Sequence, residues 1–284
     1  MSNFPETIFG LPKLTSSEFT QLSAFIYEQC GIKLPPAKKI LLESRLNKRL
    51  RALHLTSFRD YVNYLQSKEG IQQELIHMID EVTTNKTDFY REPHHFTLLN
   101  DQILPDFQRL QLRRPFKIWS AACSSGEEPY TLAIVLNEFS KENPGFDFNI
   151  IASDISTEIL QKAVKAVYSM ERVLPVPATL KHRYFLKSND QTRPTVRVVP
   201  GLRNKVQFFR LNLMDKIFEM DDNLDVVFCR NVLIYFDRAT QQEVLRKIVE
   251  KIRPGGYLFI GHSESLFQLD LPIVQVKPTV FKKK

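Results

Sequence analysis

The chain's most constraining feature is a loop of small residues, WSAACSSGEEPY, which runs from Trp119 to Tyr130. The residues before it, from Phe116 to Trp119, have the apolar character of a short buried strand. After it, apolar side chains recur at helical spacing as far as Phe139. A strand that leads through a short loop into a helix is typical of parallel α/β sheets, in which ligands bind beyond the carboxyl ends of the strands.

The first turn of the predicted helix carries two carboxylates, Glu127 and Glu128, followed by Pro129, and this composition fits a helix start. The carboxylates argue against a bound phosphate, which prefers unopposed amide donors at a helix N-terminus. They favour a ligand that carries a positive charge or hydroxyl groups, and S-adenosylmethionine carries both. The sequence also lacks the G-x-G-x-x-G and G-x-x-x-x-G-K-[ST] patterns, so dinucleotide and P-loop sites are disfavoured.

The next predicted strand, Phe148 to Ser153, ends at Asp154. An acidic residue in this place, one βαβ unit after the loop, commonly accepts hydrogen bonds from a ribose diol. Alternatively, Asp154 is the N-cap of a helix that is predicted over Ser156 to Val167. Its spacing from the first loop favours the ribose interpretation.

A third cluster follows an apolar strand that is predicted over Val226 to Cys229. Arg230, Asn231 and Tyr235 come after this strand, so they are expected at the same edge of the sheet as the first two loops. The residues on either side of Tyr235 fit core positions better, which leaves Tyr235 to face the site.

Composition places the chain among ordinary globular proteins of one or two domains, with 284 residues, 43% hydrophobic and 25% charged. No apolar run approaches the roughly 18 residues of a membrane span, and the N-terminus lacks a signal layout. A cytoplasmic location without membrane insertion is therefore expected. Three cysteines without a C-x-x-C pattern indicate neither a disulfide framework nor a zinc site. The adjacent His94 and His95 point in different directions on a helix, so a structural role is expected and no metal.

Residues 1–84 are predicted to form an all-α N-terminal domain and residues 85–284 an α/β domain, with a polar break at Thr83 to Asp88. Apolar spacing and caps predict helices in the first domain at Ser16 to Cys30, Pro36 to Leu53, Phe58 to Gln66 and Ile71 to Val82. Leu42, Leu46, Leu50 and Leu53 form the expected buried face of the second of these. In the second domain strands alternate with helices, and a helix over Arg238 to Arg253 is expected to stop at Pro254-Gly255-Gly256.

Five segments along the chain, TTNKTDFYREPHHF, WSAACSSGEEPY, ASDIS, CRNVLIYFD and GHSES, resemble the motifs of the chemotaxis receptor methyltransferase (CheR) family. The resemblance implies a class I (Rossmann-like) S-adenosylmethionine-dependent methyltransferase domain, preceded by an all-α substrate-recognition domain. It also implies methyl transfer to glutamate side chains of chemoreceptors in receptor adaptation, which yields glutamyl methyl esters and S-adenosylhomocysteine. The partner would be the cytoplasmic helical region of the receptors, and the enzyme a monomer associated with receptor arrays.

By this resemblance, the residues expected to bind the cofactor are Asn85, Thr87, Arg91, Glu128, Asp154, Asn212, Leu213, Arg230 and Asn231. Glu128 and Asp154 would hold the amino-acid and ribose portions. Arg91 and Tyr235 are expected to be catalytic, since they would lie near the transferred methyl and orient the acceptor carboxylate. That carboxylate is already ionised at neutral pH, because the unperturbed pKa of glutamate is about 4.3. No general base is needed, and catalysis is expected to rest on positioning and the exclusion of water.

Residues 33–51 contain seven basic residues against one acidic residue, Glu43. A basic stripe beside a leucine face is usually the solvated side of an amphipathic helix. The density of charge also favours a surface for acidic, helical receptor segments, with Arg45, Lys48, Arg49 and Arg51 as substrate-binding residues.

Residues 180–210 interrupt the alternation of strands and helices. Three short strands, at Tyr184 to Leu186, Thr195 to Val199 and Val206 to Phe209, are expected to form a small antiparallel insert without helices between them. Some CheR enzymes dock a receptor tail here by strand addition. The turn Lys187 to Pro194 lacks the glycine typical of those enzymes, and Pro194 removes a backbone donor, so an enzyme that needs no receptor tail is predicted.

The net charge of +7 also admits a nucleic-acid substrate, so RNA methylation is the alternative function. Enzymes that methylate amines commonly carry an Asn/Asp-Pro-Pro-aromatic motif, whereas Asn231 to Tyr235 lacks both prolines. This difference favours a carboxylate as the group that receives the methyl. A carboxylate has no N–H groups, so the hydrogen-bond acceptors of the amine motif are not needed. A non-catalytic cofactor-binding scaffold is disfavoured because every motif is intact.

Overall fold

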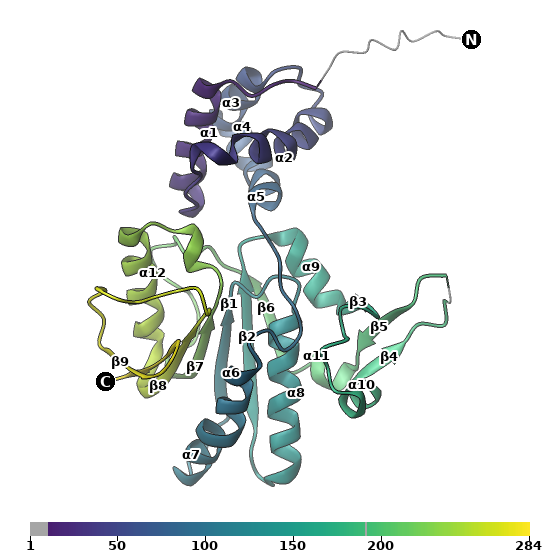
Figure 1. Cartoon of the computed structure of the whole chain (residues 1–284), viewed down its shortest axis with the longest axis vertical. Helices are drawn as coiled ribbons and strands as arrows, with labels where there is room; N and C mark the ends of the chain where they lie inside the picture. Colours follow the sequence, from purple (N-terminus) through teal and green to yellow (C-terminus); the bar gives the residue numbers. More distant parts are fainter. Residues whose placement is uncertain (1–10, 191) are drawn as a thin grey trace. The chain divides into compact units, whose positions relative to one another are not determined.

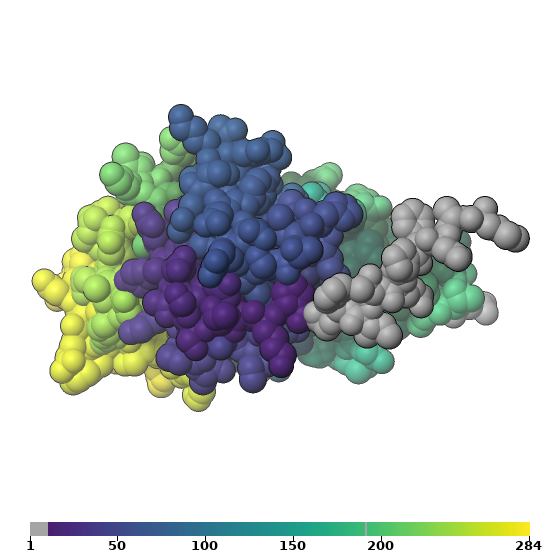
Figure 2. Space-filling model, turned by 90° about the horizontal axis from the view of Figure 1, so that it is seen from above, coloured from purple at the N-terminus to yellow at the C-terminus, as the bar shows by residue number. Residues whose placement is uncertain are grey.

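The computed structural model describes residues 11–190 and 192–284, and it divides into two compact units between Thr83 and Thr84 (Figure 1). The N-terminal unit is all-α and is drawn purple to blue in the cartoon and in the space-filling view (Figure 2). Its helices are α1 (Ser16–Cys30), η1 (Pro36–Lys38), α2 (Lys39–Ala52), α3 (Phe58–Gln66), α4 (Lys68–Gln73) and α5 (Leu75–Val82).

Local sequence signals set the ends of these helices. Helix α1 begins at a capping box formed by Thr15 and Glu18, and it ends at Gly31, which has a φ of 72° that favours glycine. The bounds of α1 and α3 confirm the sequence prediction. The single helix expected over residues 71–82 is wrong, because Ser67 caps a separate short helix and the chain breaks at the buried Glu74. Leu53 lies beyond the end of α2 and is only half-buried.

The C-terminal unit contains a seven-stranded sheet in the order β6-β2-β1-β7-β8-β10-β9. The strands are β1 (Phe116–Ala121), β2 (Phe148–Asp154), β6 (Val206–Arg210), β7 (Leu224–Cys229), β8 (Ile252–Ile260), β9 (Ile273–Lys277) and β10 (Val280–Lys283). The first five in this order are parallel, and β10 is antiparallel to both β8 and β9. The predicted α/β fold is therefore confirmed, with a mixed sheet whose five parallel strands are extended at one edge by β10 and β9.

Alternating side chains of the strands bury against helices on both faces of the sheet, which gives three layers (Figure 1). Ile118 of β1 packs in one core with α6 (Pro93–Leu98), η2 (Leu99–Ile103), α7 (Leu104–Arg109) and α8 (Glu127–Glu142). Trp119, the next residue, packs in the other core with α12 (Arg238–Lys251). Because the strands run parallel through this frame, the loops at their carboxyl ends gather at one edge.

The expected antiparallel insert is present, but its composition differs from the prediction. The small sheet has the order β3-β5-β4, from β3 (Val167–Ser169), β4 (Phe185–Lys187) and β5 (Thr195–Val198). The segment Val206–Arg210 is instead β6 of the main sheet, parallel to β2. Three short helices, α9 (Thr157–Lys165), α10 (Ala178–Tyr184) and α11 (Pro200–Arg203), flank the strands, so the expectation of no intervening helix is also wrong.

The strand order also changes the argument about Pro194. The strand after Pro194, β5, is the central strand of the small sheet, and the edges available to an added strand belong to β3 and β4. Pro194 therefore removes no donor from an edge strand. The prediction that no receptor tail docks here now depends only on the glycine-free connection at residues 188–194.

The Pro254-Gly255-Gly256 segment does not stop α12, which already ends at Lys251. It lies inside β8, where the register with β7 shifts between Leu224 and Val226. A Cβ on Gly256 would lie 2.9 Å from the carbonyl oxygen of Asp225, so glycine allows the two strands to approach at this irregularity.

Candidate functional site

The loop after β1 reverses the chain through backbone conformations that favour small residues. Ala122, Ser124 and Gly126 have φ values of 58°, 51° and 96°. A Cβ on Gly126 would lie 2.9 Å from the hydroxyl of Tyr168 and 3.0 Å from the Cβ of Ala163, so only glycine fits without displacement. The loop is thus built from small residues, and its backbone packs closely against Tyr168 and Ala163 at the start of α8.

Asp154 joins this loop to the next one. Its Oδ2 accepts a hydrogen bond of 2.8 Å from the backbone N–H of Ser124, and its Oδ1 accepts one of 3.0 Å from Ser156. The N-cap of α9 is Ser156, whose hydroxyl accepts from the N–H of Ile159, so the alternative role of Asp154 as that cap is wrong. Asp154 is buried at the carboxyl end of β2, beside the loop expected to bind the cofactor.

Glu128 and Arg230 form a buried ion pair at the same edge of the sheet. Arg230 Nη1 donates to Glu128 Oε2 at 2.9 Å, and the hydroxyl of Ser120 donates to Glu128 Oε1 at 2.6 Å. Burial raises the pKa of Glu128, and Arg230 opposes that rise. The guanidinium of Arg230, a residue predicted to bind the cofactor, is thus held beside Glu128 at the edge where the cofactor is expected. It positions Glu128 against the segment that precedes α6.

Arg230 reaches that segment through two further contacts. Its Nη2 donates to the carbonyl oxygen of Arg91 at 2.5 Å and lies 3.2 Å from Glu92 Oε2. Glu92 Oε1 in turn accepts from the N–H of His262 at 3.1 Å and from the amide of Asn231 at 3.5 Å. Although burial raises the pKa of Glu92, Arg230 and the N–H of His262 together lower it. Glu92 was not singled out in the sequence, and its place beside Arg91 in REPHHF is the signal that could have identified it.

The segment that contains Asn85, Thr87 and Arg91 is attached to the loops by its backbone. The hydroxyl of Ser124 donates to the carbonyl oxygen of Asn85 at 3.0 Å, and Arg172 donates to that of Thr87 at 2.6 Å. Arg91 is half-buried as a residue, and its guanidinium donates an exposed hydrogen bond of 3.0 Å to the carbonyl oxygen of Lys86. These three predicted residues therefore lie beside the β1 loop and Arg230.

Asn212 and Leu213 follow β6, whose last residue pairs with Asp154. The side-chain oxygen of Asn212 accepts from the N–H of Met214 at 3.0 Å, which shapes the turn, and Leu213 is buried in the core. Tyr235 ends the 3-10 turn Leu233–Tyr235 and is half-buried. Of its neighbours, Phe236 is buried as expected, but Ile234 is 51% exposed, so its predicted core position is wrong.

His95 has the structural role that was expected. It is fully buried between Phe228 and Phe259, and its Nε2 lies 2.8 Å from the hydroxyl of Thr279. Burial, reinforced by nearby Arg230, lowers the pKa of His95 to about 3, so it is neutral at physiological pH. Glu92, His94 and His95 each bring a possible ligand atom within 4.8 Å of the others. The guanidinium of Arg230 already compensates the negative charge of Glu92, so no metal ion is needed for that purpose.

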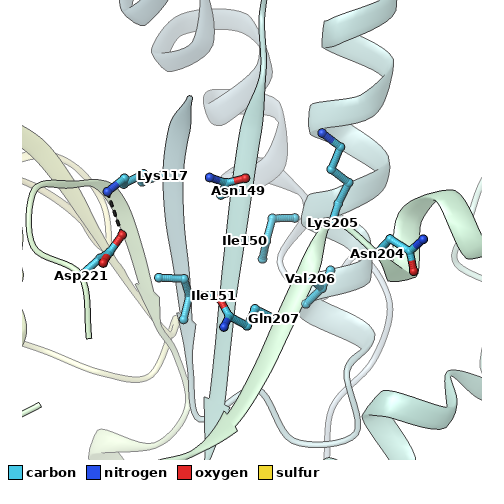
Figure 3. Close-up of a pocket in the computed structure, with 9 residues that line it drawn as sticks. All are labelled: Lys117, Asn149, Ile150, Ile151, Asn204, Lys205, Val206, Gln207 and Asp221. Atoms are coloured by element: carbon cyan, nitrogen blue, oxygen red, sulfur yellow. Dashed lines mark hydrogen bonds and ion pairs between the residues drawn. The ribbon is translucent and has the colours of Figure 1, made fainter. Parts of the chain in front are cut away.

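A separate cavity of about 450 Å³ lies toward the amino ends of β1, β2 and β6 (Figure 3). Two lysines line this cavity. Lys117 forms an ion pair of 2.8 Å with Asp221, which Figure 3 shows as a dashed line. Lys205 forms an ion pair of the same length with Asp147. Both lysines of the cavity are thus neutralised by ion pairs, and the cavity lies away from the edge that carries the predicted residues.

The predicted substrate-binding residues lie in the N-terminal unit, and two of them have structural roles. Arg49 forms a two-fold hydrogen bond of 2.8 and 2.7 Å with the buried Glu74, and Arg45 donates to the carbonyl oxygens of Val82 and Thr83. Lys48 and Arg51 are exposed, with Lys48 paired to Glu81 at 3.0 Å. Of these four predicted residues, Lys48 and Arg51 are therefore the most exposed, whereas Arg45 and Arg49 are half-buried.

Two family models match the chain. The one described as CheR methyltransferase, all-alpha domain, matches residues 17–83, and the one described as CheR methyltransferase, SAM binding domain, matches residues 85–281. The chain is 41% identical to chemotaxis protein methyltransferase 2 of Pseudomonas aeruginosa, over 98% of this chain and 97% of that protein. It is 38% identical to the chemotaxis protein methyltransferase of Borreliella burgdorferi, over 95% of each chain. For the Escherichia coli protein of that name, identity is 40% over 90% of this chain and 87% of the relative.

Proposed function

The chain belongs to the CheR methyltransferase family, and from this premise we infer that it transfers a methyl group from S-adenosylmethionine to glutamate side chains of chemoreceptors. The products are glutamyl methyl esters and S-adenosylhomocysteine. The inference depends on the match of both domains to the family. It is supported by the motif residues, which lie together at one edge of the sheet. Membership also removes support from the alternative of RNA methylation.

The residues at this edge fit the cofactor chemically. S-adenosylmethionine supplies an activated methyl group on a positively charged sulfur, together with ribose hydroxyls. The edge provides the carboxylates Asp154 and Glu128 beside a loop of small residues, and these groups are acceptors for hydroxyls and ammonium groups. We propose that Asp154 accepts from the ribose and that Glu128, held by Arg230, faces the amino-acid end. The cofactor surface in this proposal is completed by Asn85, Thr87, Arg91, Asn212, Leu213, Arg230 and Asn231.

Arg91 and Tyr235 are proposed to orient the acceptor carboxylate for in-line attack on the methyl carbon. The carboxylate is already ionised, so these residues need to bind and align it and to exclude water, not to remove a proton. Arg91 makes one described hydrogen bond through Nη1, and a guanidinium has five N–H donors with which to bind a carboxylate.

Substituting Arg91 by alanine, or Tyr235 by phenylalanine, is expected to lower turnover more than cofactor affinity. Loss of a charge-assisted hydrogen bond of about 1.5 kcal/mol predicts a roughly tenfold lower kcat for Arg91→Ala, and Tyr235→Phe should lose less. Methylation kinetics at saturating cofactor, with calorimetry of S-adenosylhomocysteine, separate the two effects. A fall in affinity that matches the fall in kcat would make these residues cofactor ligands only.

The exposed basic surface of α2 is proposed to attract the acidic helical segments of the receptor. Lys48→Glu should raise the receptor KM several-fold, and the effect should shrink at high salt, because exposed charges are screened. Lys162→Glu is a matched control, since Lys162 is equally exposed and paired with Glu158 on α9. Reversal of Arg49 is unsuitable, because it would leave Glu74 buried without its partner. Equal receptor KM values for the two variants would contradict the proposal.

Incubation with methyl-labelled S-adenosylmethionine and receptor-containing membranes tests the function directly. Base-labile label on a receptor-sized band is expected, since methyl esters hydrolyse in base and methylamines do not. Stable label on RNA would contradict the assignment. Within residues 11–190 and 192–284, no helix is long and apolar enough to cross a membrane. We propose that the enzyme acts in signal transduction as a cytoplasmic monomer that associates with receptor arrays through its substrate.

A further inference from the structure

A buried carboxylate, Glu264, joins the loop after β8 to the turn after β7. Its Oε2 accepts hydrogen bonds from the backbone N–H groups of Gly261 at 2.6 Å and Asn231 at 2.9 Å. Its Oε1 accepts from the N–H of Leu233 at 2.7 Å. One carboxyl side chain thus accepts hydrogen bonds from three backbone amides that belong to two separate segments of the chain. Burial raises the pKa of Glu264, and these backbone donors oppose that rise.

The turn that Glu264 holds carries the acceptor side of the proposed site. Asn231 has a left-handed φ of 58°, a conformation that costs a non-glycine residue roughly 1 kcal/mol. The bond from its N–H to Glu264 fixes this conformation, which directs the Asn231 side chain toward Glu92. The 3-10 turn that follows begins at Leu233, the other residue bound by Glu264, and ends at Tyr235.

Gly261 supports the same arrangement by letting the two segments approach. A Cβ in its place would lie 2.4 Å from Nδ2 of Asn231, 2.8 Å from the N of Asn231 and 2.8 Å from Oε2 of Glu264. Each of these distances is shorter than side chains tolerate. Any larger residue at position 261 would therefore displace Asn231 or the carboxylate that holds it.

We propose that Glu264 is a positioning residue for methyl transfer, which sets the backbone of the Asn231–Tyr235 turn so that Tyr235 meets the acceptor carboxylate. The proposal rests on the proposed function. Glutamine cannot replace it, because an amide offers one acceptor oxygen and would point N–H donors at backbone N–H groups. Aspartate is one methylene too short to reach both segments.

Kinetics of Glu264→Gln, at saturating concentrations of S-adenosylmethionine and receptor, test the proposal. We expect kcat to fall at least tenfold, because Tyr235 no longer aligns the substrate carboxylate. The Kd of S-adenosylhomocysteine should rise by a smaller factor than kcat falls, because Asn231 is the one proposed cofactor residue that Glu264 contacts directly. Gly261→Ala, which keeps the carboxylate, should lower kcat similarly, so the test stands even if one variant fails to fold. Glu264→Asp should recover little of the lost activity.

Asp225→Asn is the matched control, because Asp225 is also buried and lies near the amino end of β7, the strand that leads to Arg230. Its oxygens accept from Arg114, Arg253 and the N–H of Lys117. We expect this variant to lower Tm and to keep kcat within twofold in the folded enzyme. If Glu264→Gln keeps its kcat, or if both variants lose kcat in proportion to Tm, the proposal is overturned. Absence of base-labile receptor methylation by the unmodified enzyme would instead reject the proposed function.

Discussion

Glu128→Ala is expected to abolish nearly all methyl transfer. The substitution removes the carboxylate that accepts from Arg230 and Ser120 and leaves the Arg230 guanidinium buried beside Glu92 alone. Breaking a buried ion pair from one side costs about 3–5 kcal/mol, because the remaining charge is poorly compensated. If most of this cost falls on the cofactor complex, kcat/KM should drop by a factor of at least about 100. Initial rates of receptor methylation measure this directly.

Two variants of helix α8 separate the role of the charge from loss of structure. Glu128→Gln keeps the shape and one acceptor oxygen, so its activity should lie between those of Glu128→Ala and the unmodified enzyme. Glu138→Ala removes a carboxylate further along α8 that pairs at the surface with Arg183 and Lys141. Because surface ion pairs contribute little to stability, this variant should remain active. A Glu128→Ala enzyme with ordinary kcat/KM would contradict the proposed place of Glu128 in the cofactor site.

Several features of the fold were predictable because they depend on residues close together in the chain. The ends of α1 follow from Thr15, Glu18 and Gly31, which are local signals. The convergence of Asp154 and Arg230 was also predictable, since each follows an apolar strand and parallel strands end at one edge. Local periodicity thus predicts the helices and strands, and the position of a residue after a strand predicts that it lies at the edge of the sheet that carries the site.

Partners that are distant in sequence were not predictable. Arg49 looked like a solvated charge, but its partner Glu74 lies 25 residues away and is buried by the fold. Glu264 and Glu92 contact groups 33 and 139 residues away, mostly backbone amides that have no sequence signature. The misassigned strand Val206–Arg210 has the same cause, because only its pairing with β2 distinguishes it from the insert.

Asp154→Ala is expected to weaken cofactor binding more than loss of a single hydrogen bond would. The charge-assisted bond that we propose to the ribose accounts for about 1.5–3 kcal/mol. The substitution also removes the acceptor of the Ser124 and Ser156 amides, and each buried N–H left without a partner costs a further 1–3 kcal/mol, roughly. Since Ser124 belongs to the strained loop after β1, that loop should lose its preformed shape. Titration calorimetry with S-adenosylhomocysteine should give a Kd raised by about 100-fold or more.

A comparison of three variants separates the two contributions. Asp154→Asn keeps one amide acceptor but loses the charge, so it should bind the cofactor with intermediate affinity. Asp147→Ala removes an exposed aspartate just before β2, where it pairs with Lys205, and should leave the Kd unchanged. If Asp154→Asn and Asp154→Ala bind equally weakly, the negative charge itself is what the ribose and loop amides require. If neither differs from the unmodified enzyme, cofactor binding depends neither on a ribose contact of Asp154 nor on its hydrogen bonds to the loop amides, and the ribose must be bound by another group at the carboxyl ends of β1 and β2.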